Sequence, residues 1–121
     1  MLLKETFKKK VITLECREMG GDLLVVLSGG EKAHVGSCIL AVPRPALDNK
    51  KKISCTSSVM NLLGHKDEEV GRGAAEAIAK KLNKKVVLVC GIHYDGLSGQ
   101  EIKEIGKISK RLVERFLKKK T

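Results

Sequence analysis

Residues 85–92 read Lys-Val-Val-Leu-Val-Cys-Gly-Ile, an almost uninterrupted apolar run. A strand with apolar side chains on both of its sides is typical of the centre of a sheet, where both faces are covered or well buried. The run therefore predicts a central strand. The remaining elements must then be arranged around it.

Four segments ahead of this run predict further strands. Apolar and polar side chains alternate in residues 11–17, which is typical of a half-buried strand. The glycine pairs Gly20-Gly21 and Gly29-Gly30 predict tight turns between successive strands. The predicted strands cover residues 11–17, 23–27, 35–42 and 53–60.

Two amphipathic helices lie on either side of the apolar run. The first covers residues 66–82, with acidic side chains in its first turn and Lys80 and Lys81 at its end, as the helix dipole favours. The second opens with the capping box Ser98-x-x-Glu101. The order β-β-β-β-α-β-α predicts an α+β fold, a single mixed sheet with two helices packed on it, in one domain over residues 1–121.

The charge balance permits an anionic partner. The chain carries 24 basic and 14 acidic residues, a net charge of +10, with lysine runs at 8–10, 50–52 and 118–120. Nucleic acid, an acidic protein or a phosphorylated ligand would each suit this charge. With only three aromatic residues, the chain has few rings on which bases could stack, so nucleic acid is the least favoured of the three.

The cysteine pattern indicates a reducing compartment. The four cysteines show no CxxC or zinc-finger spacing, and each lies in an apolar, strand-like stretch. The first residues do not resemble a secretory signal, and no apolar run approaches the ~20 residues that span a bilayer. We therefore expect a cytoplasmic protein without disulfide bonds.

Two similar motifs precede the two helices. They are Gly64-His65-Lys66-Asp67 and Gly91-Ile92-His93-Tyr94-Asp95, each with a His-x-Asp pair after a glycine. If the strands before the two helices run parallel, both helices begin at the same edge of the sheet and the motifs meet there. Helix N-termini attract anions, so we expect one binding site built from both motifs. The phosphate of a ligand would lie near Lys66, and a flat ring near Tyr94.

Three more residues are candidates for this site. His34 lies at the same edge if the strands at 35–42 and 53–60 are antiparallel. Ser57 and Ser58 are candidates for hydroxyl contacts near the end of their strand. The alternatives are ordinary: capping carboxylates, a solvated loop, and hydroxyls on the solvent face of a strand. A metal site of two His and two Asp is disfavoured, because His-x-Asp in a tight turn rarely aims both side chains at one ion.

The motifs in their order resemble the small prenylated-flavin chaperone family, the LpdD-like proteins associated with gallate decarboxylase. The resemblance spans residues 14–108. It rests on these segments: Leu27-Ser28-Gly29-Gly30, His34-Val35-Gly36-Ser37, Ser57-Ser58-Val59 and the two His-x-Asp motifs. The arrangement of sheet and helices is also similar to proteasome-assembly-chaperone folds.

The resemblance implies a non-enzymatic carrier of prenylated flavin mononucleotide (FMN) or FMN. Such a carrier would pass its cargo to a UbiD-type decarboxylase after a UbiX-type prenyltransferase has made it. Two other functions stay open: a small enzyme using His65 or His93 as general acid-base, and a basic protein that binds RNA or an acidic protein. A homodimer or higher homo-oligomer is expected, because a small sheet with two helices leaves apolar strands uncovered.

Overall fold

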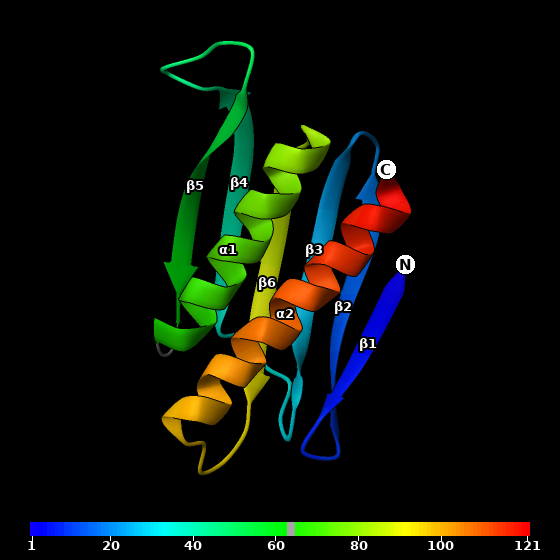
Figure 1. Cartoon of the computed structure of the whole chain (residues 1–121), viewed down its shortest axis with the longest axis vertical. Coiled ribbons are helices and arrows are strands. Elements are labelled where there is room, and N and C mark those ends of the chain that lie inside the picture. Colours follow the sequence, from blue (N-terminus) through cyan, green and yellow to red (C-terminus); the bar gives the residue numbers. More distant parts are fainter. Residues whose placement is uncertain (63–64) are drawn as a thin grey trace.

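The computed structural model describes residues 1–62 and 65–121, and of residues 65 and 66 it describes the backbone. It is a single six-stranded mixed sheet with two helices packed on one face, as Figure 1 shows, so the predicted α+β class is confirmed. The elements are β1 (Leu2–Phe7), β2 (Lys10–Met19), β3 (Asp22–Gly30), β4 (Ser37–Pro45), β5 (Ile53–Asn61), α1 (His65–Leu82), β6 (Val86–His93) and α2 (Gly99–Lys120).

The apolar strand β6 lies inside the sheet, as predicted. The strand order is β1-β2-β3-β6-β4-β5, and β6 is parallel to β3 and antiparallel to β4. Because β5 is also antiparallel to β4, β5 and β6 run in the same direction. Both helices therefore begin at the same end of the sheet, where the loop from β3 to β4 also lies (Figure 1).

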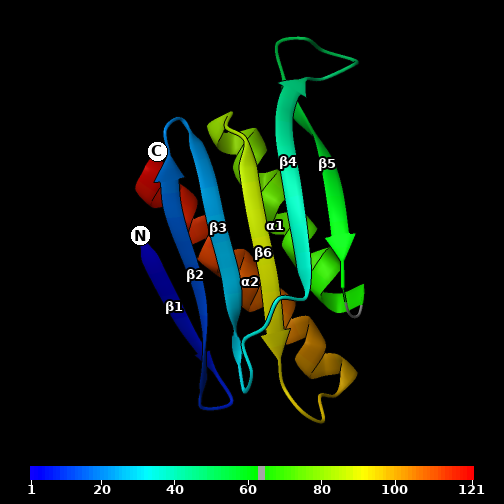
Figure 2. The ribbon, with the colours of Figure 1, turned by 180° about the vertical axis from the view of Figure 1, so that it is seen from behind.

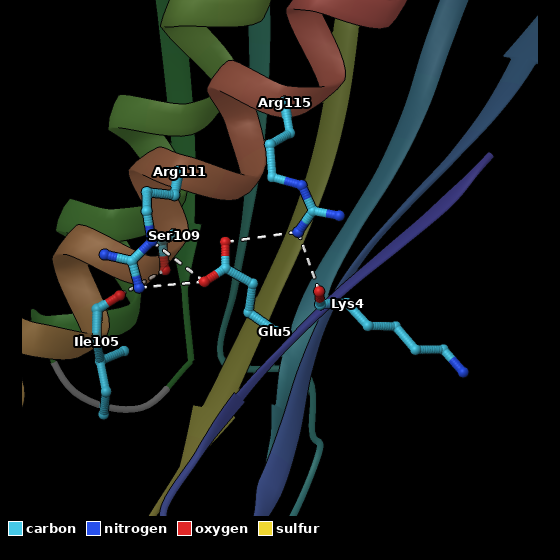
Figure 3. Close-up of polar contacts among 6 residues, drawn as sticks. All are labelled: Lys4, Glu5, Ile105, Ser109, Arg111 and Arg115. Atoms are coloured by element: carbon cyan, nitrogen blue, oxygen red, sulfur yellow. Dashed lines mark hydrogen bonds and ion pairs between the residues drawn. The ribbon is translucent and has the colours of Figure 1, made fainter.

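The edge strand β1 was not predicted. It pairs with β2 through a turn at Lys8 and Lys9, whose φ angles of 51° and 65° lie in the left-handed region where glycine and asparagine are usual. Two lysines give no turn signal, so the hairpin is not apparent from the sequence. Figure 3 shows how α2 holds β1: the Arg111 Nε donates to the Glu5 carboxylate at 3.1 Å, and Arg115 donates to the Lys4 carbonyl oxygen at 3.0 Å.

Strand β4 continues past the predicted end at residue 42. Pro43 and Pro45 lie within it, paired with Cys55 and Ile53 of β5. The pairing of β4 with β6 stops at Ala41, so beyond that residue β4 is hydrogen-bonded on one side alone. Prolines are tolerated there because no neighbour requires their missing N–H groups.

The core between the sheet and the helices is aliphatic around one fully buried aromatic residue, Phe116. Gly71 lets α1 approach the sheet closely, since a Cβ there would lie 2.7 Å from the Ile39 Cδ1. All four cysteines lie in strands and are free thiols. Burial raises the pKa of Cys90 to about 12, so this thiol stays protonated and unreactive. Neither helix is long and apolar enough to cross a membrane, within the residues described.

Candidate functional site

Asp67, in the first turn of α1, joins three segments at the end of the sheet where both helices begin. Its Oδ1 accepts the backbone N–H of Ile92 in β6 at 3.2 Å. Its Oδ2 lies 3.2 Å from the Nε2 of His34, in the loop between β3 and β4. Its backbone carbonyl accepts the hydroxyl of the fully buried Ser37 at 3.1 Å. One carboxylate thus fixes the helix start against both the central strand and the loop.

His34 and His93 lie side by side at this end of the sheet. Their ring centroids are 6.3 Å apart, with an interplanar angle of 83°. The Nδ1 of His34 is 3.2 Å from the Lys32 carbonyl oxygen, so both nitrogens of this ring face acceptors. A neutral imidazole can donate only one of these hydrogen bonds, whereas the protonated ring donates both.

His93 is paired with the carboxylate of Asp95. Its Nε2 lies 2.8 Å from the Asp95 Oδ1, and this hydrogen bond lowers the pKa of the Asp95 carboxyl group. The backbone N–H of Asp95 donates to the Glu31 Oε2 at 2.9 Å, and the Glu31 N–H donates to the His93 carbonyl oxygen at 2.7 Å. Glu31, absent from the predicted site, therefore ties the end of β3 to the second His-x-Asp motif.

Two glycines allow the loop between β3 and β4 to lie directly on the site. A Cβ at Gly91 would overlap the backbone carbonyl oxygen of His34. A Cβ at Gly36 would lie 2.9 Å from the Cγ of Asp67. The Gly36 N–H donates to the Cys90 carbonyl oxygen at 2.9 Å, which closes the loop onto β6. The role of Gly91 is thus to let the backbone of His34 lie directly against β6.

The structure brings together five of the residues proposed from the sequence: His34, Asp67, Gly91, His93 and Asp95. Gly64 and the side chains of His65 and Lys66 lie outside the described residues. Ser57 and Ser58 are separated from the others. They lie on β5 four and three residues before Asn61, respectively, about 10–13 Å from that end of the strand. The Ser57 hydroxyl donates to Glu76 of α1 at 2.7 Å, and Ser58 is on the opposite face of the sheet.

Tyr94 belongs to the core and not to an exposed surface. Only 6% of the residue is exposed, and its ring packs edge-on against Phe7, with centroids 5.4 Å apart. Its hydroxyl donates to the Phe7 carbonyl oxygen at 2.8 Å, and burial raises the pKa of this phenol. A flat ligand was predicted to lie against this ring, but the buried ring has no free face for one. Instead, Tyr94 secures the turn between β1 and β2.

A groove lies between the two helices, and little in the sequence indicates it. Its volume is about 400 Å³. A Cβ at Gly73 or Gly106 would meet nothing within 4 Å, so these two glycines leave the space open. Only those glycines hint at such a groove. The lining residues are Glu69, Val70, Gly73, Ala74, Ala77, Gly106, Ser109, Lys110, Val113, Glu114 and Leu117.

The described residues include no group of three or more His, Cys, Asp and Glu side chains that could hold a metal ion. What the sheet end offers instead is hydrogen bonding: two imidazoles, the start of α1, a loop held by glycines, and the carboxylates of Asp67, Asp95 and Glu31. Such an end suits a strongly polar group. The groove between the helices suits an apolar one, and its volume is in the range of small-molecule sites.

The fold of this chain has a counterpart among solved structures. One solved structure, described as "Crystal Structure of a Novel Chaperone Complex for Yeast 20S Proteasome Assembly", matches with a TM-score of 0.59 and 10% identity. The match covers 96% of this chain and 94% of that chain, and it shows the fold alone. The search of curated proteins found no match.

The chain belongs to the family described as the prenylated flavin chaperone LpdD-like domain. The family's sequence pattern matches residues 6–121. This confirms the resemblance drawn from the motifs and extends it beyond residue 108, to the end of α2.

Proposed function

We propose that this protein binds prenylated FMN or FMN as cargo, without chemical turnover, and delivers it to a UbiD-type decarboxylase in the cytoplasm. The observation that carries the proposal is the family match over residues 6–121. A UbiX-type prenyltransferase, which makes the prenylated flavin, would be the source of the cargo. The start of α1 lies beside His34, whose ring lies against that of His93, and a helix N-terminus supports binding of a phosphorylated ligand.

Because Tyr94 is buried, we propose a position for the flavin ring away from this residue. We place the phosphate at the start of α1, near Lys66, and the ring in the groove between the helices. The lining of this groove begins at Glu69 and Val70, about 6 Å along the helix axis from Lys66. An FMN molecule can span that separation through its ribityl chain. The apolar residues of the groove would shield the ring, and the prenyl-derived carbons with it.

The variant Lys66→Ala tests the phosphate position. A lysine beside the helix N-terminus adds charge to the N–H groups that already favour a phosphate. Its loss should weaken FMN binding by about 1–3 kcal/mol, or roughly 5- to 150-fold, and leave riboflavin binding unchanged. Isothermal titration of both ligands measures this. Lys81→Ala, at the other end of α1, is the matched control and should bind both ligands as the native protein does.

The variant Gly73→Leu tests the ring position in the same titrations. The fold has room for the new side chain, because a Cβ at Gly73 meets nothing within 4 Å. A filled groove should weaken FMN and riboflavin equally, since both carry the ring. Unchanged binding of both ligands would place the ring elsewhere.

A second candidate function is supported by the two imidazoles paired with carboxylates. His93 with Asp95, and His34 with Asp67, have the composition of general acid-base pairs. An enzyme of this kind would convert its ligand, whereas a carrier returns it unchanged. Mass analysis of FMN recovered after incubation separates the two functions. Conversion that His93→Gln abolishes would favour the enzyme.

A further inference from the structure

The face of the sheet opposite the helices is open in Figure 2, except at the end of β6, where the loop between β3 and β4 lies on Gly91. An antiparallel sheet with one solvated face normally carries polar side chains on that face. Here three of the four inner strands, β3, β6 and β4, carry apolar side chains on it. Leu40 is 43% exposed and Val26 is 40% exposed.

The strand register places these side chains in two adjacent rows across the sheet. The first row runs Glu15, Val26, Val89, Cys38, Met60. The second row runs Arg17, Leu24, Val87, Leu40, Ser58. Each row begins with a charged residue on β2 and continues with three apolar residues on β3, β6 and β4. We call these two rows the open-face patch.

The open-face patch is complementary to itself. A two-fold axis that lies in the interface, perpendicular to the strands and between the two rows, exchanges one row with the other. Glu15 of one copy then faces Arg17 of the second copy, and Val26 faces Leu24. On β3, β6 and β4 apolar residues meet apolar residues, Met60 of β5 faces Ser58, and the two opposite charges meet twice. A two-fold (isologous) dimer interface requires a surface that is complementary to itself in this way.

The charge and size of the face also favour a second copy as its occupant. The patch contains no lysine, although the chain carries a net charge of +10, so an acidic partner would be drawn to other surfaces. Five strands at about 4.8 Å and nine residues at about 3.3 Å give a whole face of roughly 700 Å², which includes the two rows of the patch and the end at Gly91 that the loop covers. A stable dimer of ordinary size buries about 800 Å² on each partner.

We propose that two copies of this chain stack face to face through the open-face patch, with their helices outward and Glu15 of each copy paired with Arg17 of the other. This arrangement buries the apolar rows of β3, β6 and β4. It leaves the ends of both sheets, and the grooves between the helices, accessible. The proposal stands independently of the proposed cargo, because it rests on the sheet alone.

Sedimentation equilibrium of the full chain tests the proposal. The native protein should be a dimer, and Leu40→Glu should be a folded monomer, because it buries two carboxylates in an apolar interface. Leu47→Glu is the matched control, since Leu47 is 92% exposed in the loop between β4 and β5, outside the patch, and it should remain a dimer. Circular dichroism and thermal unfolding check that each variant is folded.

A charge exchange tests the two-fold geometry without altering the apolar rows. Glu15→Arg places like charges opposite each other and should weaken dimerisation about tenfold. The double variant Glu15→Arg with Arg17→Glu restores opposite charges and should restore the native dimerisation constant. A native protein that is monomeric at its highest soluble concentration would overturn the proposal. So would a dimer that Leu40→Glu leaves intact, or a double variant no stronger than Glu15→Arg.

Discussion

Replacing Gly91 with alanine should destabilise the protein by more than about 3 kcal/mol, a large effect for the addition of one methyl group. The new Cβ would overlap the backbone carbonyl oxygen of His34, and backbone atoms cannot rotate away as a side chain can. The loop between β3 and β4 must then move off β6. That movement breaks the hydrogen bond from the Gly36 N–H to the Cys90 carbonyl oxygen.

Urea denaturation measures this loss of unfolding free energy. Gly73→Ala is the matched control, because its Cβ meets nothing within 4 Å in the middle of a helix. Alanine there should stabilise the protein by about 0.5–1 kcal/mol through its higher helix propensity. A Gly91→Ala variant within about 1 kcal/mol of the native protein would mean that the His34 backbone does not pack tightly on β6.

The second large effect is expected for Asp67→Ala, which should lower the free energy of unfolding by about 2–4 kcal/mol. The substitution leaves the Ile92 N–H without its acceptor and separates His34 from its carboxylate. It also removes a negative charge from the first turn of α1, where the helix dipole favours one. Asp67→Asn keeps an acceptor for Ile92 and should lose less than half as much.

Hydrogen exchange of the Ile92 amide distinguishes the two variants further. We expect faster exchange in Asp67→Ala than in Asp67→Asn, because only the first lacks an acceptor. Equal stability and equal exchange in both variants and the native protein would show that Asp67 does not hold the junction together.

The elements that could be predicted from the sequence are those whose signals are local. The apolar run at β6 predicted a central strand, and the capping box predicted the start of α2, where the Ser98 side chain accepts the Glu101 N–H. The prediction that the two His-x-Asp motifs meet followed from strand directions alone, since a parallel pair of strands puts both helix starts at one end. His34 was placed at the same edge on a separate condition, that the strands at 35–42 and 53–60 are antiparallel, which the pairing of β4 with β5 confirms.

Features that depend on long-range packing could not be predicted in this way. The Tyr94 hydroxyl bonds to Phe7, 87 residues earlier in the sequence, in a hairpin that has no turn signal. A tyrosine beside glycines was interpreted as a ligand contact because no residue nearby in the sequence could pack against its ring. Likewise, Ser57 faces α1 because of the strand's register, and the groove exists because of how two helices pack.

Transfer of cofactor to an apo-decarboxylase of the UbiD type tests the central claim most directly. The protein is loaded with prenylated FMN, freed of unbound cofactor by gel filtration, and mixed with the apo-enzyme, and decarboxylation is followed. We predict that activity appears in proportion to the loaded protein and that the cofactor is then found on the decarboxylase. Failure of the protein to retain prenylated FMN, or retention with no activity gained by the decarboxylase, would contradict the role of a flavin carrier.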